Sequence, residues 1–593
     1  MMKGTSILLL ACLSVLALPA FAKTTVIDFP GAKSSGVQFD ELKDGTLEFE
    51  ASLASMRLED VTLGGRNYVA IESSELAKVF NEGSPNLPVF SKLIEVPVGA
   101  TVSYEVVSQN STVVELNSYG IDSKIAPAQP SASKSSDLSQ LRTYFNAQEY
   151  ALDSFNGSKL VQVKDLGILR SVRLAQLTIS PFEYNAVSNT LKVRNNVVVR
   201  VYFKNTNEKA QQDLTNRYSS SIFNDVLSQT VSNLRFVPFT RENPTFVIVT
   251  PKKFEETLQP FIDYKRSQNY NMVVAFTEDI GKTTTAIKDY LTNLYNNPVN
   301  GYLPHHYVLF VGDVADVPAF KGTTGPHVRD FPYCEYTGDA LPDALYGRFS
   351  AATVDELKNI VDKTLAYETR TMPDPSYLSR ALMVAGADSS HQMTWGNGQI
   401  RYGVNNYFNA DNGIDIIQLL QPDSKREYSA RIKSEINKGL GFANYTAHCS
   451  SSGWADPSFV KSDLTSLTNE GKFGVWIGNC CQSSKFEEAA SFGESVLRLK
   501  NKGAAAYIGT SNYSYWDEDY WWGVGFKPVV AEPVYDEGHI GAYDRMFRME
   551  YNKASQMILA GNIAVEESTS TRKKYYWEIY NLMGDPSLTV QLK

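Results

Sequence analysis

Two adjacent cysteines, Cys480 and Cys481, follow the apolar stretch "FGVWIGN". A disulfide between them is disfavoured, because consecutive Cα atoms lie about 3.8 Å apart and a relaxed bridge joins Cα atoms about 5.5–6 Å apart. A cysteine thiolate is a strong nucleophile when a neighbouring base accepts the thiol proton. The pair therefore suggests that one of the two cysteines has a chemical role.

His448 is the candidate base, because it ends another apolar stretch, "GFANYTAH". In a cysteine protease, an imidazole takes the thiol proton and returns it to the leaving amine, while backbone amides stabilise the oxyanion. The amides of Cys449 and of the nucleophile are the candidate donors. Successive side chains of a strand point to opposite faces, so only one cysteine is expected to face the histidine. The alternatives are a surface or capping histidine and a cysteine that is a small apolar filler.

These residues need a scaffold, and from residue 245 onward solid apolar runs alternate with helical stretches. The runs are "TFVIVT", "MVVAFT", "HYVLFVGD", "RALMVAGAD", "IDIIQLL", "GFANYTAH", "FGVWIGN" and "AAAYIGTS". This pattern predicts an α/β fold with a mainly parallel sheet flanked by helices. Chemistry in such sheets gathers beyond the carboxyl ends of the strands, where Asp388, His448 and the cysteine pair stand. The stretch "YETRTMPDPSYL" is interpreted as a joint between subdomains 236–375 and 376–593.

Residues 23–235 are predicted to form a β-rich domain, because short runs alternate apolar and polar residues between turn signals. Within it, "SKIAPAQPSASKSSD" is interpreted as an exposed loop. A polar helical segment over about 207–234 leads to a linker that carries Arg235 and Arg241.

Residues 1–22 have the features of a secretory signal peptide: Lys3, a short apolar core and "AFA" before the expected cleavage site. We therefore expect a secreted protein, with the periplasm as an alternative. Lipid attachment at Cys12 is disfavoured, because the apolar run before it is very short. No other apolar run is long enough to span a membrane. The net charge of −9 argues against nucleic acid as the main partner.

The cysteine content does not indicate a disulfide scaffold. Removal of the signal peptide leaves four cysteines, of which Cys449, Cys480 and Cys481 lie close together in sequence beside His448. An exported chain of this length would need more cysteines for such a scaffold. Chemistry explains the cluster better, and a bridge between Cys449 and Cys480 remains open.

Longer motifs resemble a known family. The segments "FANYTAHCSSSGWADP", "IGNCCQSSKFEEAASFGE", "YIGTSNYSYWDEDYWWGVG" and "YNLMGDPSL" are similar to motifs of the gingipain family of secreted bacterial cysteine endopeptidases, above all its lysine-specific branch. The resemblance covers nearly all of 245–590, and the front region resembles the inhibitory propeptide of that family. It implies a caspase-like catalytic domain in two subdomains, preceded by a β-rich propeptide.

The resemblance also assigns roles to single residues. Cys481 is implied to be the nucleophile, which forms an acyl-enzyme, with His448 as general base and Asp388 as the acid that orients it. Cys480 is then expected to pack on the opposite face. The alternative for Asp388 is a helix cap. Cys449 stands where the family has glycine, so a position that needs positive φ would be strained, and lower activity or redox regulation would follow.

The segment "SYWDEDYWW" combines aromatic residues with three acids. Aromatic walls suit the apolar stem of a lysine and attract its ammonium group, which a carboxylate neutralises. The resemblance places Asp519, Trp516 and Thr446 in the substrate pocket, with Asp517 and Glu518 next in line for the pocket acid. The arginine-specific relatives take that acid from an earlier segment, and 389–410 contains no acid at the corresponding place, which favours lysine. An exposed acidic loop is the alternative.

The segment "TGDALPDALYGR" resembles a calcium-binding loop of the family. Oxygen ligands at short spacing suit calcium, and the matching ligands are Asp339, the Leu341 carbonyl and Asp343, while Thr337 replaces a carboxylate. An Asx-rich turn is the alternative. No organic cofactor is expected, and His305–His306 is interpreted as a surface pair.

The leading hypothesis is a secreted cysteine endopeptidase, made as a zymogen, that cleaves protein and peptide substrates after lysine. Its own propeptide is expected to inhibit it through a lysine that fills the substrate pocket, and to be cut away near Arg235 or Arg241. Lys124 and Lys134 are the candidates, and Lys124 is favoured because it lies just before the family-like "PAQP". The alternatives are an arginine-preferring peptidase, a non-catalytic binding or adhesion protein on a decayed protease fold, and a transpeptidase.

Overall fold

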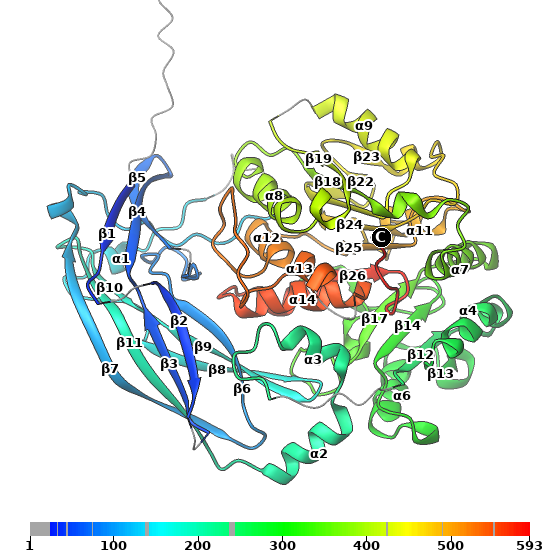
Figure 1. Cartoon of the computed structure of the whole chain (residues 1–593), viewed down its shortest axis with the longest axis horizontal. Helices are drawn as coiled ribbons and strands as arrows, with labels where there is room; N and C mark the ends of the chain where they lie inside the picture. The colour runs from blue at the N-terminus through cyan, green and yellow to red at the C-terminus, as the bar shows by residue number, and fades with distance from the viewer. Residues whose placement is uncertain are drawn as a thin grey trace, which may run out of the picture.

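The computed structural model describes residues 24–31, 34–42, 45–73, 75–136, 142–235, 243–422, 425–488, 490–548 and 552–592. The expected signal peptide and Arg241 of the expected processing linker lie outside these residues. A β-rich domain stands beside a larger α/β domain (Figure 1). Within the described ranges, no helix combines the length and the apolar character that crossing a membrane requires.

The β-rich domain consists of three antiparallel sheets. The largest has the order β10-β11-β3-β2, with β7 also paired to β11, and the others are β1-β4-β5 and β6-β9-β8. Buried and half-buried residues alternate along much of β11, as expected for a strand with one face in the core. Its strands are β1 (Thr24–Asp28), β2 (Gly36–Glu41), β3 (Leu47–Ser52), β4 (Ser55–Leu63), β5 (Arg66–Glu72), β6 (Phe90–Glu95), β7 (Thr101–Glu115), β8 (Val161–Leu169), β9 (Val172–Ile179), β10 (Phe182–Asn185) and β11 (Thr190–Lys204).

Two helices connect this domain to the α/β domain. The solvated helix α2 (Glu208–Tyr218) begins at Asn207, whose side chain accepts a hydrogen bond from the amide of Ala210. The next helix, α3 (Ser221–Leu227), is almost entirely buried, and Phe223 packs in the same apolar core as the sheet of the α/β domain. The two domains therefore share buried surface at this point.

The α/β domain is built on one ten-stranded sheet with the order β13-β12-β14-β17-β26-β25-β24-β20-β18-β19. All neighbouring strands are parallel except β25 and β26. The two halves of the sheet therefore run in opposite directions and meet at β26. The strands are β12 (Thr245–Thr250), β13 (Asn271–Phe276), β14 (Tyr307–Val311), β17 (Leu345–Phe349), β18 (Arg380–Ala385), β19 (Asp415–Leu419), β20 (Phe442–Ala447), β24 (Val475–Cys480), β25 (Ala506–Thr510) and β26 (Tyr580–Met583).

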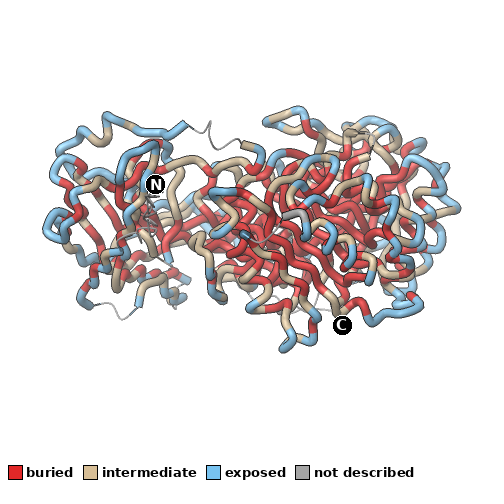
Figure 2. Tube along the Cα trace, turned by 90° about the horizontal axis from the view of Figure 1, so that it is seen from above, coloured by how far each residue is buried: buried red, intermediate tan, exposed pale blue. Residues whose placement is uncertain are grey.

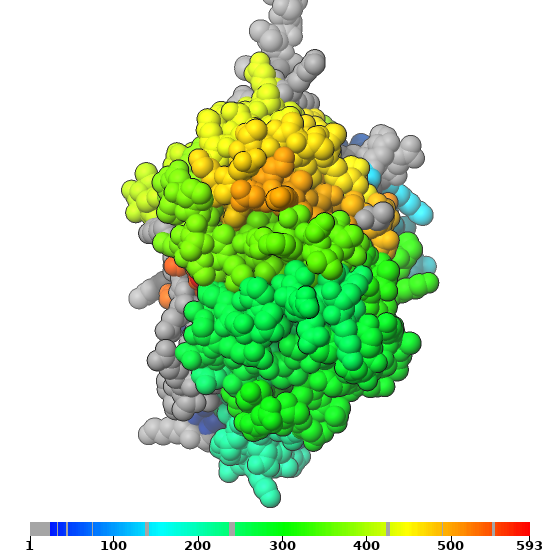
Figure 3. Space-filling view, turned by 90° about the vertical axis from the view of Figure 1, so that its right-hand side faces the viewer, coloured from blue at the N-terminus to red at the C-terminus, as the bar shows by residue number. Residues whose placement is uncertain are grey.

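Helices cover both faces of this sheet, which confirms the predicted fold class. On the side shown in Figure 3, residues of the first half in green lie directly below residues of the second half in yellow and orange. The principal helices are α4 (Glu255–Ser267), α6 (Thr284–Asn296), α7 (Val354–Thr369), α8 (Asn397–Asn406), α9 (Lys425–Lys438), α11 (Phe492–Arg498), α12 (Trp516–Val524), α13 (Ala542–Arg548), α14 (Ala554–Glu567) and α15 (Lys573–Ile579).

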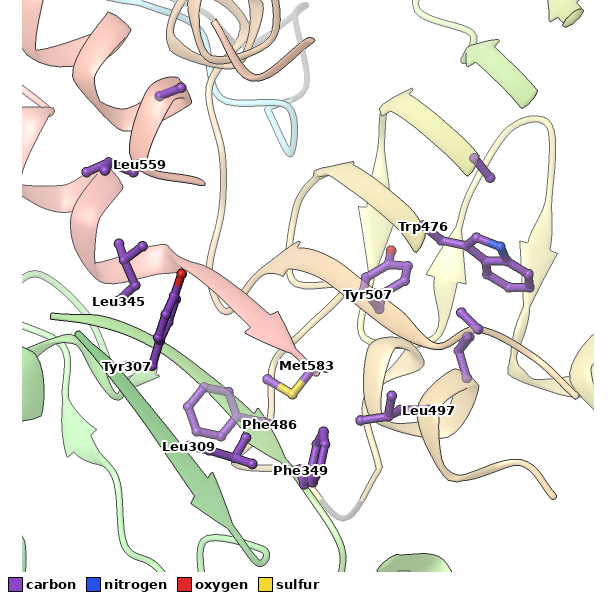
Figure 4. Close-up of a cluster of buried hydrophobic side chains, with 14 of the residues drawn as sticks. Tyr307, Leu309, Leu345, Phe349, Trp476, Phe486, Leu497, Tyr507, Leu559 and Met583 are labelled. Atoms are coloured by element: carbon purple, nitrogen blue, oxygen red, sulfur yellow. The ribbon is translucent and has the colours of Figure 1, made fainter. Parts of the chain in front are cut away.

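One apolar core runs through both halves of the sheet. Figure 4 shows Tyr307 and Phe349 from the first half on one side of Met583, and Trp476 and Tyr507 from the second half on the other. The tube in Figure 2 shows the same buried centre in the larger domain, with exposed residues at the periphery of the molecule. The strand ends of the second half are therefore held on a rigid, fully buried support.

Candidate active site

Sheet order brings the predicted catalytic residues to one edge. Strands β20 and β24 are parallel neighbours, with Ala447 in register with Cys480. His448 directly follows β20 and Cys481 directly follows β24, so both residues lie at the same edge of the sheet. Strand β18 flanks β20 on its other side, and Asp388 follows this strand. The three residues come from separate parts of the sequence and reach the same edge because these strands are adjacent. Among them, a hydrogen bond joins Asp388 to His448, while Cys481 contacts Ser514.

Asp388 holds His448 by its Nε2 atom, at 2.9 Å from Oδ2. The other carboxylate oxygen accepts hydrogen bonds from the amides of Ser390 (2.9 Å) and His391 (2.7 Å) and contacts Nδ1 of His391 at 3.0 Å. Burial opposes the charge, but these hydrogen bonds outweigh it and keep the pKa of Asp388 well below its usual range. Asp388 thus contacts the imidazole and also caps the turn after β18, whereas the helical segments that follow, from Gln392 and from Asn397, have no side-chain cap.

Cys481 is fully buried next to Ser514, whose amide donates to Sγ at 3.4 Å. Burial raises the pKa of this thiol to about 11, although the Ser514 amide lowers it in part. Gln482 has a φ of +58°, which turns the chain sharply away from the sheet directly after the cysteine. In this form of the protein, Cys481 is therefore a protonated thiol.

A disulfide joins Cys449 to Cys480, with their Cα atoms 5.4 Å apart. The bridge that the sequence left open is therefore present, and Cys480 does more than pack on the opposite face. It links the residue after the candidate base to the residue before the candidate nucleophile. Cys449 begins β21 (Cys449–Ser450) and its φ is not positive, so a cysteine in place of glycine is not strained here.

The predicted substrate pocket contains a lysine of this same chain. The ammonium of Lys134, which is 1% exposed, forms an ion pair with Asp519 (Nζ to Oδ2, 2.8 Å) and lies 4.8 Å from the ring centroid of Trp516. It also donates to Thr446 Oγ1 at 3.0 Å, and to the carbonyl oxygen and Oδ1 of Asn479 at 2.8 and 2.9 Å. Burial lowers the pKa of this ammonium, and the Asp519 carboxylate opposes that shift.

The backbone around Lys134 lies antiparallel to the segment that precedes α12. The amide of Lys134 donates to the carbonyl of Ser514 (2.9 Å), and the amide of Trp516 donates to the carbonyl of Ala132 (3.0 Å). The carbonyl oxygen of Lys134 contacts Nδ1 of His448. A segment of the β-rich domain thus occupies the candidate active site, held by an antiparallel β-bridge between Ser133 and Tyr515.

Matches with known proteins identify the family. The model of Peptidase family C25 matches residues 239–591, and the model Propeptide_C25 matches residues 43–236. The chain belongs to peptidase family C25. Lys-gingipain of Porphyromonas gingivalis is 36% identical over 600 residues, which cover 98% of this chain and 34% of that protein. This C25 chain therefore spans about a third of the length of that relative.

Solved structures agree with the fold of this C25 chain. A structure described as "Structure of Protease" is 36% identical, has a TM-score of 0.56 and covers 59% of this chain and 79% of its own. The crystal structure of the Arg-specific cysteine proteinase gingipain R matches with a TM-score of 0.50 at 24% identity, over 60% of this chain and 80% of that one, and shows the fold alone. The resemblance inferred from the motifs is thereby confirmed.

Two expectations about the propeptide segment are wrong. The stretch predicted as an exposed loop is largely buried: Ala128 bonds to Ser84 inside the β-rich domain, whereas Ser131 and Lys134 contact the C25 domain. Lys124, favoured as the pocket lysine, instead donates to the carbonyls of Ala186 and Val187 inside the β-rich domain. The polar composition of this stretch predicted that it would be exposed. The residues that cover it are distant in the sequence, so the stretch itself gives no sign of them.

The acidic segment of α12 is not an exposed loop either. Asp519 is fixed by the hydroxyls of Tyr576 (3.0 Å) and Tyr580 (2.7 Å), which donate to its Oδ1. Its neighbours face elsewhere: Asp517 pairs with Lys78 of the β-rich domain at 3.0 Å, and Glu518 accepts a hydrogen bond from Ser570 at 2.5 Å. Of the three acids in this segment, Asp519 alone pairs with Lys134.

Sequence reasoning missed Asn479, which offers two oxygens to the bound ammonium. Its side-chain amide is held by the carbonyl of Asp519 (3.2 Å) and the hydroxyl of Tyr580 (2.8 Å), so Oδ1 faces the pocket. The available signal was a polar residue inside an otherwise apolar strand end, directly before the cysteine pair. Such a residue needs a partner when it is buried.

The predicted calcium loop is folded, but its side chains do not converge. Within the described ranges, no cluster of three or more acidic, histidine or cysteine side chains is arranged to hold a metal. Asp343 is buried and accepts from the amide of Tyr336 at 2.6 Å, and burial raises the pKa of Asp343 to about 7. Asp339 accepts from the amides of Leu341 (3.0 Å) and of Ile168 in the β-rich domain (2.6 Å).

The histidine pair predicted to lie on the surface is buried. His305 and His306 are 1% and 0% exposed, and burial lowers the pKa of both well below its usual value. His305 Nε2 lies 2.6 Å from the hydroxyl of Tyr336, so this histidine has a structural partner. The prediction of a surface pair was wrong because two polar residues before a strand do not reveal whether other parts of the fold will cover them.

Proposed function

We propose that this chain is the latent form of an exported cysteine endopeptidase that cleaves peptide bonds after lysine. The observation that carries the proposal is the burial of Lys134 against Asp519, beside Cys481 and His448. A lysine of the chain itself fills the pocket next to the thiol, so its contacts display the preference of the pocket. The Lys-gingipain relative, by its name, has the same specificity.

The reaction follows from the groups at the strand ends. With Asp388 on Nε2, His448 accepts the thiol proton of Cys481 at Nδ1, and the thiolate attacks the carbonyl carbon of the lysine residue. The amides of Cys449 and Cys481 stabilise the oxyanion. The C–N bond then breaks, the leaving amine takes the proton from His448, and an acyl-enzyme remains. Water hydrolyses this thioester, with His448 again as the base, and regenerates the thiol.

The β-rich domain acts as the inhibitor by two contacts. Its lysine occupies the pocket, and the Lys134 carbonyl oxygen faces Nδ1 of His448, the nitrogen that must take the thiol proton. A ring nitrogen whose N–H donates to this carbonyl has no lone pair left for the thiol proton. Cys481 stays protonated, because burial raises its pKa to about 11. The Lys134–Ser135 bond is therefore held unproductively.

The pocket suits an ammonium better than a guanidinium. Four oxygen atoms, from Thr446, Asn479 and Asp519, surround the single nitrogen of Lys134. A lysine donates its three protons from one point, whereas a guanidinium is planar and matches a flat, two-oxygen acceptor. This geometry does not favour the arginine-preferring alternative. The assembled thiol, base and orienting acid likewise do not favour a non-catalytic protein.

The test uses matched fluorogenic peptides that end in lysine or arginine before the cleaved bond. After removal of the β-rich domain, lysyl peptides should be hydrolysed at least tenfold faster in kcat/KM than arginyl peptides, and a lysyl chloromethyl ketone should label Cys481. The Cys481→Ala variant is the control for the role of the thiol. Equal rates on both peptides would reject the proposed preference for lysine. If neither peptide is hydrolysed and Cys481 is not labelled, the proposed peptidase activity is rejected.

We further propose calcium at the loop from Asp339 to Asp343. The fit rests on one buried oxygen of Asp343, Oδ1, which has no hydrogen-bond partner within the described part of the chain. The Asp339 carboxylate accepts a hydrogen bond from the amide of Ile168 in the propeptide. It would be free to bind calcium together with the Leu341 carbonyl and Asp343 only after that hydrogen bond is broken. Calcium should therefore raise the Tm of the mature domain more than that of the uncut chain. An equal shift in both, or none, would argue against this site.

A further inference from the structure

Arg170 lies at the tip of the β8–β9 hairpin, and its side chain is only 2% exposed. Its Nη1 atom donates to the carbonyls of His305 (2.7 Å) and Asp343 (2.8 Å), and its Nη2 to that of Pro304 (2.8 Å). The Nε atom donates to the carbonyl of Tyr218 at 3.0 Å. Four of its five N–H groups therefore have a carbonyl acceptor.

Within the described ranges, no carboxylate forms an ion pair with this guanidinium, and the buried carboxylate of Asp343 acts on it only from a longer distance. A buried cation without a counter-ion is unfavourable unless hydrogen bonds and dipoles compensate the loss of water. Here the carbonyls do so together with the rings of Tyr295 and Phe223, whose centroids lie 5.4 and 5.6 Å from Cζ of Arg170. The planar guanidinium of an arginine carries donors on three nitrogens and can reach all of these carbonyls, whereas a lysine has a single nitrogen and cannot.

The site is separate from the lysine pocket but lies at the same edge of the sheet. Pro304 and His305 precede β14, and Asp343 precedes β17. Because the halves of the sheet run in opposite directions, the amino ends of β14 and β17 lie at the edge where β20 and β24 end. Strands β26 and β25 stand between β17 and β24. At about 4.8 Å per strand, the two sites are roughly 15–25 Å apart.

The hairpin tip is shaped to the C25 domain. Figure 1 shows the hairpin reaching out of the β-rich domain toward the large sheet, beside α3. At Gly167 a Cβ atom would come within 2.6 Å of the Asp339 side chain, and the next amide, that of Ile168, donates to Asp339. Arg170 itself has a φ of +62°, a conformation that is unfavourable for a residue with a side chain. The turn places the guanidinium directly in its pocket.

We propose that the C25 domain carries a guanidinium-binding site, formed by the carbonyls of Pro304, His305 and Asp343 and the ring of Tyr295, that holds the propeptide through Arg170 independently of Lys134. The proposal deepens the latency proposed above. A cut in the 236–242 linker does not free the lysine pocket, because the propeptide stays attached at two distant places. Both contacts must open before the cut propeptide can dissociate.

The experiment measures release of the propeptide from the cut chain. The full chain carries Cys481→Ala and, within 236–242, a recognition sequence for an unrelated protease, and is immobilised through its C-terminus. After cutting, surface plasmon resonance follows dissociation for Arg170→Lys, Arg170→Gln and Lys134→Ala, alone and combined. Arg173→Lys is the matched control, because Arg173 lies on the same hairpin and pairs with Asp165 within it.

Arg170→Lys and Arg170→Gln should release the propeptide at least tenfold faster than Arg173→Lys, since each loses carbonyl contacts of a buried charge. The acceleration should persist in the Lys134→Ala background, where the lysine pocket is empty. Release no faster than in the control, or an effect of Arg170 that vanishes once Lys134 is alanine, would overturn the second site. Neither outcome depends on peptidase activity, so a failure here is distinct from a failure of the proposed function.

If the Arg170 variants do not fold, a competition measurement tests the same site without them. N-acetyl-arginine amide should speed release from the cut Lys134→Ala chain, and N-acetyl-lysine amide at the same ionic strength should not. Equal acceleration by both would show a general salt effect and contradict a site for guanidinium.

Discussion

The carbonyl oxygen of Lys134 faces Nδ1 of His448, while the ammonium of the same lysine is buried against Asp519. One residue of the β-rich domain thus blocks both the base and the pocket. Occupation of the pocket alone would leave the imidazole able to take the thiol proton. The two contacts together explain how a segment with the preferred side chain can remain uncut.

Lys134→Ala should weaken latency in the otherwise intact chain. It removes a buried ion pair and three further hydrogen bonds, and loss of one partner of a buried charged pair costs about 2–5 kcal/mol. We expect at least tenfold more hydrolysis of a lysyl peptide by the uncut chain. Lys124→Ala is the matched control and should stay latent, since Lys124 bonds only within the β-rich domain. Equal activity in both variants would contradict this role of Lys134.

Asp519→Asn should lower kcat/KM for lysyl peptides at least tenfold, because the substrate ammonium loses its only carboxylate partner in a buried pocket. Asp517→Asn is the comparison, since Asp517 pairs with Lys78 and not with the pocket lysine. The measurement is a steady-state assay of both mature variants. A larger loss in Asp517→Asn would place the pocket acid elsewhere.

The pH dependence of Cys481 alkylation should report latency. Burial raises the pKa of this thiol to about 11 in the latent chain. The thiol therefore stays mostly protonated even at pH values above about 8.5, the ordinary pKa of a cysteine. The rate of iodoacetamide labelling should then rise about tenfold per pH unit until about pH 11. After release of the propeptide, the rate should level off at lower pH. Identical profiles before and after release would refute the link between burial and latency.

The Cys449–Cys480 bridge should stabilise the site and support turnover. A crosslink over 31 residues contributes about 3–4 kcal/mol by restricting the unfolded chain. The Cys449→Ala/Cys480→Ala variant should have a lower Tm and a lower kcat with little change in KM, because base and nucleophile are no longer joined. Cys334→Ala, at a free buried cysteine in the other half of the sheet, should keep its kcat.

Reduction separates the crosslink from general effects of substitution. A dithiol reductant should lower the Tm of the wild-type domain, as two electrons convert the disulfide into two thiols, and leave the Tm of the double variant unchanged. Cys481→Ala should abolish activity with or without the reductant. Full activity of the double variant, with an unchanged Tm, would show that the bridge is dispensable.

The sequence alone determined the scaffold and the chemistry that it carries. Solid apolar runs between helical stretches predicted the strands of the sheet, since burial on both faces requires apolar residues at every position. The same runs ended at Asp388, His448 and the Cys480–Cys481 pair, so the local pattern located the candidate strand ends, while the choice of Cys481 and the role of Asp388 came from the family resemblance. The choice of Asp519 among three neighbouring acids came from the family resemblance, because periodicity alone does not separate them.

Tertiary structure decided which distant groups meet. Sequence reasoning favoured Lys124 over Lys134 and was wrong, since the answer depends on which lysine a folded β-rich domain presents to the sheet edge. The pairing of Cys449 with Cys480 depends on β20 and β24 being neighbours. Arg170 was not found from its surroundings in sequence, because its acceptors are backbone carbonyls, which every residue has. Only the fold determines where four of them point at one guanidinium.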